Sequence, residues 1–158
     1  MSGRRLALAA GCFVICGCAP GAAAAPSGSP SPGPAVLTVR AASGRLLATF
    51  TVSVADTEAA RERGLMGVTH LGSTSGMVFA FPSTTTVAFW MKDTLIPLDI
   101  AFWDNRGTVI TVQRMQPCRA DPCPLYQASA PYAGAVEVAG GVLASDGVAA
   151  GDTVVLRR

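Results

Sequence analysis

Apolar and polar residues alternate along much of the chain after residue 35, with the period of two that is typical of half-buried strands. The clearest run lies at 48–54, where apolar residues at even positions alternate with threonine and serine. A shorter alternating run lies at 37–41, and Ser43-Gly44 separates the two runs. Two strand patterns joined by turn residues predict a β-hairpin.

The rest of the domain carries similar short strand patterns and little helix. Further strands are predicted at 77–81, 87–92, 98–103, 108–113, 135–138 and 153–156. A two-turn helix is predicted between Asp56 or Thr57, either of which can cap its start, and Gly64, which ends it. Residues 140–146 offer a single further helical turn. This pattern predicts an all-β fold, an antiparallel β-sandwich or barrel with one or two short helices.

Residues 1–18 have the organisation of an export signal. Arg4 and Arg5 precede an uncharged apolar run at 6–16, which is too short to cross a bilayer as a helix. The sequence ICGC at 15–18 then resembles a bacterial lipobox, although its second position usually holds a small residue. We therefore expect Cys18 to be the lipidated residue.

Other forms of export remain open at this point. The alternatives are a secretory signal cut near 22–25, where A-x-A patterns occur, and an uncleaved anchor. Residues 19–34 are Pro, Gly, Ser and Ala without charge, a composition typical of an extended tether. Residues 35–158 then form one domain. We expect it to be anchored to the cell membrane by lipid on the extracytoplasmic side, or secreted if the lipobox is not used.

The charge balance changes the expected partners. The chain has 12 basic and 10 acidic residues, and Arg4 and Arg5 are lost with the signal. The mature protein then has 10 of each, without the basic stripe that binds a phosphate backbone. We therefore expect no nucleic-acid partner.

Two of the five cysteines lie in the domain, Cys118 and Cys123, in the sequence PCRADPCP. In an oxidising compartment, so close a pair predicts a disulfide. Redox catalysis and metal binding are the alternatives, but the spacing is not C-x-x-C and His70 is the only histidine. We expect a structural disulfide and no metal site.

A series of motifs then resembles a known family. They are ARERGLMG at 60–67, SGMVFAF at 75–81, FWMKDTLIPLDIAF at 89–102, MQPC with CPLY at 115–126, and AGD at 150–152. Together they resemble the bacterial and archaeal family named domain of unknown function 192, over about residues 46–156. The resemblance implies a compact, jelly-roll-like β-sandwich, often exported, and no assigned reaction. The family usually has Asn at the position of Asp93 and a basic residue at that of Val68.

A candidate ligand site follows from strand geometry. Side chains alternate between faces, so Trp90 and Lys92 share one face of their strand, and Asp99 lies on one face of the next. Pairing these two strands would bring Lys92 beside Asp99. An ammonium, a carboxylate and an indole in a concavity suit a polar ligand such as a sugar or a zwitterion. The full predicted set is Arg63, Met66, Trp90, Met91, Lys92, Asp93 and Asp99.

Three functions remain open on the sequence alone. The first is a non-enzymatic module that binds a small polar ligand or an envelope partner. The second is a hydrolase acting on envelope carbohydrate or peptidoglycan, using Asp99 with Lys92 or Glu62 as an acid–base pair. The third is a structural interaction module in which Lys92 and Asp99 form an ion pair and the aromatics form core.

Other catalytic signals are weak. His70 lies in a Gly/Ser-rich loop near Ser73 and Ser75, and no G-x-S-x-G elbow accompanies them. Phosphate-binding loops and EF-hand loops are also absent from the sequence, so we expect no cofactor.

Overall fold

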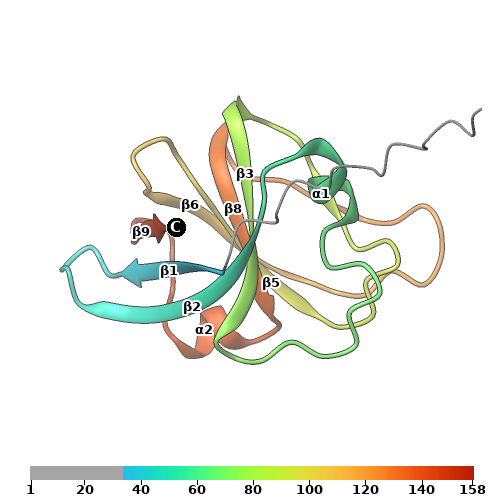
Figure 1. The fold of residues 1–158 in the computed structure, drawn as a ribbon, viewed down its shortest axis with the longest axis horizontal. Helices are drawn as coiled ribbons and strands as arrows, with labels where there is room; N and C mark the ends of the chain where they lie inside the picture. Colours follow the sequence, from blue (N-terminus) through green and yellow to red (C-terminus); the bar gives the residue numbers. More distant parts are fainter. Residues whose placement is uncertain (1–33) are drawn as a thin grey trace, which may run out of the picture. The chain divides into compact units, whose positions relative to one another are not determined.

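Nine strands and two short helices make up residues 34–158, the part of the chain that the computed structural model describes (Figure 1). The elements in chain order are β1 Ala35–Arg40, β2 Leu46–Ala55, α1 Glu58–Arg63, β3 Ser75–Thr85, β4 Phe89–Trp90, β5 Leu98–Trp103, β6 Val109–Met115, β7 Leu125–Tyr126, β8 Tyr132–Ala139, α2 Val142–Ser145 and β9 Thr153–Arg157. The predicted all-β class with short helices is confirmed. The predicted signal, and the predicted tether up to residue 33, lie outside the described residues.

Seven strands form one mixed sheet in the order β6-β5-β8-β3-β2-β1-β9. Neighbouring strands are antiparallel except β2 and β3, which run parallel because the segment at 56–74, with α1, crosses between them. Backbone hydrogen bonds from Val109 to Asp152 and from Val154 to Gly107 join the start of β6 to the start of β9. The two edges of the sheet therefore meet at one end.

Both faces of the central strands are buried, and each face has its own core. The inner cluster includes Phe50, Val78 and Val136, and the outer cluster includes Phe79, Phe102 and Tyr132. Adjacent residues of β3 and β8 thus point to opposite clusters, as strand geometry requires. The outer cluster includes residues of the connections between β2 and β3 and between β4 and β5, which cover this face of the sheet. The candidate site forms there.

Local predictions agree with the structure at the first hairpin and the first helix. β1 pairs antiparallel with β2, and Thr57 caps α1 by accepting a hydrogen bond from the Ala60 N–H at 3.2 Å. Gly64 ends the helix with a positive φ of 46°. No helix among residues 34–158 is long and apolar enough to span a membrane.

One predicted strand pairing is wrong. The 87–92 segment contributes only β4, which pairs with β7 in a separate two-stranded ribbon. β5 instead lies between β6 and β8. The chain turns between β4 and β5, and Asp93 has a positive φ of 54° in that turn. The two strands are therefore not neighbours, and the expected contact between Lys92 and Asp99 does not form.

Candidate functional site

A groove of about 520 Å³ lies over the outer core, between α1 and the segment that leads into β4. Phe79 and Phe81 of β3 line it, together with Val87 and Trp90, which remain 56% and 48% exposed. The helix contributes Glu58, Arg61 and Glu62. The groove thus combines aromatic walls with charges of both signs, a composition suited to a ligand with apolar and polar parts.

Two contacts fix the walls of this groove. The Arg61 guanidinium donates to the Ala80 carbonyl at 2.9 Å and lies 5.1 Å from the centre of the Phe81 ring, which ties α1 to β3. On the other side, the Tyr132 hydroxyl donates to the Val87 carbonyl at 2.7 Å. Both walls are therefore attached to the central sheet.

A narrow recess of about 30 Å³ shares this lining and reaches toward the sheet. It has in common with the groove the residues Arg61, Glu62, Phe79, Phe89 and Trp90, and adds Arg63, Gly64, Leu65, Met66, Thr94 and Glu137. Glu137 comes from the middle of β8, beside Met77 of β3 and Ile100 of β5.

Glu137 is the most unusual residue of the recess. Only 4% of it is exposed, and no other residue in the 34–158 range makes a hydrogen bond or an ion pair with its carboxyl group. Burial raises the pKa of this group to about 8, because the charged form loses its hydration without gaining a partner. The carboxyl group is therefore held largely protonated at neutral pH.

Sequence reasoning missed Glu137. Its signal is a single acidic residue in an otherwise apolar strand, YAGAVEVA, whose other buried positions are aromatic, aliphatic or glycine. A buried ionisable group of this kind is uncommon in a core unless it is paired, and so it marks a candidate site.

Three predicted site residues lie together at this recess, namely Arg63, Met66 and Trp90. Met91 instead belongs to the outer core and is 1% exposed. Glu62, which the sequence offered as a catalytic partner, lines both the groove and the recess. The ligand-binding role of these residues stays a prediction.

Lys92 and Asp93 line a different depression, of about 140 Å³, against the loop that carries the two cysteines. The Lys92 ammonium lies 4.0 Å from an Asp121 carboxylate oxygen and 5.5 Å from the centre of the Trp90 ring. Cys118 and Cys123 form the predicted disulfide, which closes this loop.

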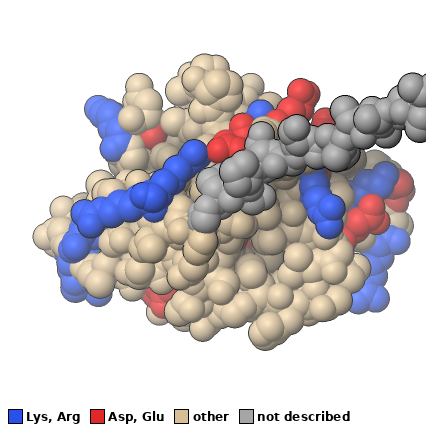
Figure 2. All heavy atoms as spheres, in the orientation of Figure 1, with Lys and Arg blue, Asp and Glu red and all other residues tan. Residues whose placement is uncertain are grey.

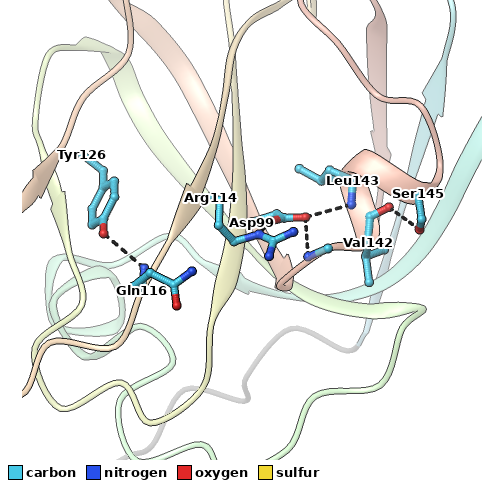
Figure 3. Close-up of polar contacts among 8 residues, drawn as sticks. Asp99, Arg114, Gln116, Tyr126, Val142, Leu143 and Ser145 are labelled. Carbon is cyan, nitrogen blue, oxygen red and sulfur yellow. Dashed lines mark hydrogen bonds and ion pairs between the residues drawn. The ribbon is translucent and has the colours of Figure 1, made fainter.

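Asp99 lies on the face of the sheet opposite the groove, against Leu143 of the inner cluster. Figure 3 shows it between Arg114 and the start of α2. One carboxylate oxygen accepts from Arg114 Nε, and the other accepts the backbone N–H groups of Gly141 at 2.8 Å and Leu143 at 3.1 Å. Asp99 is 3% exposed. Its carboxylate is fully used in structural contacts, and neither Lys92 nor Glu62 is among its partners.

The charged side chains are unevenly spread over the surface. Figure 2 shows a band of basic side chains on the left of the drawn face, with acidic side chains beside its upper end, and a group of both signs on the right. Within the described part of the chain, no three His, Cys, Asp or Glu residues are grouped to hold a metal ion.

Comparison with known protein families gives one match, over most of the described residues. Residues 38–156 match the family domain of unknown function 192, described as "Uncharacterized ACR". No match is found among the curated proteins.

Two similar solved structures share the fold. One is a putative transcription regulator from Sinorhizobium meliloti, 31% identical, with a TM-score of 0.73, covering 81% of this chain and 97% of its own. The other is a protein of unknown function from Novosphingobium aromaticivorans, 34% identical, with a TM-score of 0.71, covering 84% of this chain and 94% of its own.

Proposed function

The chain belongs to the domain of unknown function 192 family, and we propose that its domain is a non-enzymatic module that binds a small ligand in the groove beside α1. The observation that carries the proposal is the buried carboxyl group of Glu137 in a small recess that shares the aromatic lining of the groove. A groove of about 520 Å³ has the size of a small-molecule site. A few polar groups at one end would fix the orientation of the ligand.

We also propose that the domain works on the extracytoplasmic side of the membrane, tethered through Cys18. The basic pair, the short apolar run and the ICGC sequence support this location, and the disulfide between Cys118 and Cys123 fits an oxidising compartment. Intact-mass analysis of the mature protein tests it. A diacylglyceryl-modified Cys18 as the first residue is the expected result, and a mature chain that begins near residue 26 without lipid would refute the tether.

The groove itself is tested by ligand-observed NMR with a panel of amino acids, amino sugars and neutral sugars, followed by titration of the isotope-labelled chain. Binding should move the Trp90 indole signal and should weaken in Trp90→Ala. Leu125→Ala is the matched control, because Leu125 pairs with Trp90 across the β4–β7 ribbon and is 64% exposed without lining the groove. Equal loss of binding in the two variants would count against the groove.

A hydrolase is the second candidate, and the same carboxyl group is the observation that favours it. A glutamic acid that keeps its proton near neutral pH suits a general acid. In this reading Glu137 replaces Asp99 as the acid, since Asp99 is engaged with Arg114 and α2. Turnover of an envelope glycan that disappears in Glu137→Gln would favour the enzyme over the binding module.

The regulator name of the Sinorhizobium protein does not lead us to propose DNA binding for this chain. Residues 34–158 carry ten basic and ten acidic residues. Specific DNA-binding surfaces gather basic residues to neutralise phosphates. A small-molecule ligand fits the balanced groove better.

A further inference from the structure

We propose that the recess at the end of the groove receives a positively charged amino group of the ligand, with Glu137 as its counter-ion. The inference rests on the proposed binding function and names the chemical class of the ligand. An ammonium would supply the hydrogen-bond donors and the positive charge that the Glu137 carboxyl group lacks among residues 34–158.

The size of the recess limits what enters it. At about 30 Å³, it holds one group of the size of a water molecule. A primary ammonium has this size, whereas a carboxylate, a phosphate or a sugar ring does not. The remainder of the ligand would lie in the larger groove, which shares the aromatic lining of the recess.

Trp90, one of the aromatic residues that line the recess, already has a cation over its ring. Phe79 and Phe89 meet edge to face with ring centres 4.8 Å apart, and Trp90 lines the recess beside them. The faces of aromatic rings attract cations. The Lys92 ammonium already lies 5.5 Å from the centre of the Trp90 ring, so this ring accommodates an ammonium within the present structure.

Apart from Glu137 of β8, the charged groups that line the recess all come from helix α1. Helix α1 contributes Arg61, Glu62 and Arg63, while β3 contributes Phe79 and the turn before β5 contributes Thr94. The Arg61 guanidinium is held by the Ala80 carbonyl and the Phe81 ring. Glu62 adds a second carboxyl group and Arg63 a second guanidinium, so α1 contributes charges of both signs to the lining.

Binding would change the protonation of Glu137. The carboxyl group is protonated in the empty recess because burial raises its pKa to about 8. A nearby ammonium favours the ionised form, so the proton of Glu137 is released to water as the ammonium enters. The ligand keeps its own proton, and no covalent bond is formed or broken apart from the O–H bond of the acid.

Three four-carbon probes test the charge preference on the full chain, namely n-butylammonium, n-butanol and butyrate. Each is titrated at neutral pH while the Trp90 indole signal and the Glu137 carboxyl carbon signal are followed by NMR. We expect the ammonium to bind about tenfold more tightly than the alcohol, since charge-assisted hydrogen bonds exceed neutral ones. The carboxyl signal should move toward the ionised value only with the ammonium.

Two variants complete the experiment. Glu137→Gln keeps the shape of the side chain and should abolish the preference for the ammonium, with fold retention checked by the unchanged remainder of the NMR spectrum. Asp146→Asn is the matched control, because Asp146 lines neither the groove nor the recess, and it should keep the preference.

Equal binding of alcohol and ammonium with a shifted Trp90 signal would overturn the amino-group assignment and leave the groove in place. A preference that persists in Glu137→Gln would also overturn it. No shift at Trp90 with any probe would overturn both this inference and the small-molecule groove.

Discussion

Asp99 of β5 and Glu137 of β8 lie one register step apart on adjacent strands, yet their carboxyl groups lie on opposite faces of the sheet. Asp99 pairs with Val138, and its neighbour Ile100 pairs with Glu137. Both residues are buried, at 3% and 4% exposure. Asp99 has three hydrogen-bond donors around its carboxylate, whereas Glu137 has none among the described residues. One carboxyl group therefore serves the fold, and the other is available to a ligand.

Removal of the Asp99 carboxylate should destabilise the domain and leave the groove intact. Asp99→Ala leaves two backbone N–H groups and Arg114 without their acceptor. We expect a loss of about 3 kcal/mol in the free energy of unfolding, measured by urea denaturation. Arg114→Ala should cost less, because the Arg114 side chain is 45% exposed and Asp99 keeps its two backbone donors.

Measuring ligand binding in the groove distinguishes a structural role of Asp99 from a role in ligand binding. The folded Asp99→Ala protein should retain the affinity of the native chain for any groove ligand. A variant with unchanged stability and lost binding would show that Asp99 belongs to the site, as the sequence suggested.

Local sequence patterns predicted the elements of the fold better than their pairing. Alternation and turn residues were enough for the β1–β2 hairpin, and the Thr57 and Gly64 caps were enough for α1. The place of β4 depends on its contact with β7, which lies 35 residues further along the chain, and no local pattern encodes such a contact.

The same limit applies to the site. Three of the residues predicted for a ligand site line one recess, because their motifs flank α1 and β4, namely Arg63, Met66 and Trp90. Lys92 and Asp99 were not brought together, because Asp99 points into the other side of the sheet. Glu137 was overlooked because strand alternation says which face a residue occupies and nothing about whether a buried acid has a partner.

The hydroxyl group of Tyr132 should stabilise the groove wall. Tyr132→Phe leaves the Val87 carbonyl without its donor at 2.7 Å, and we expect a loss of about 1 kcal/mol at neutral pH. Burial raises the pKa of Tyr132 to about 12, so the hydroxyl remains a donor throughout the physiological range. Tyr126→Phe is the matched control, because the Tyr126 hydroxyl accepts an exposed bond from the Gln116 N–H. Equal losses in the two variants, measured by urea denaturation, would contradict this assignment.

Removal of the disulfide should loosen one loop without loss of the fold. The bridge between Cys118 and Cys123 spans a sequence separation of 5, and closing so short a loop contributes about 2 kcal/mol in the chain-entropy model. The double variant Cys118→Ser with Cys123→Ser should lower stability by this amount and increase hydrogen exchange around Asp121. Native-like exchange at Asp121 would show that the loop is ordered without the bridge.

Stability should fall as pH rises from 5 to 8, because of Glu137. The pKa of its carboxyl group is about 8 in the folded protein, against an ordinary value of 4.5. Between these values the folded state keeps a proton that the unfolded state releases, so raising the pH favours unfolding, by on the order of 1 kcal/mol per pH unit. Below about pH 4.5 both states hold the proton and Glu137 has no effect on the slope.

The comparison with Glu137→Gln isolates this contribution. Glutamine cannot ionise, so the free energy of unfolding of the native chain minus that of the variant should decrease steadily between pH 5 and 8 and level off above pH 8. Other groups titrate in both proteins and cancel in the difference. Urea denaturation at several pH values measures it. A difference that is constant with pH would mean that Glu137 is ionised throughout this range, and it would contradict the raised pKa of the folded protein.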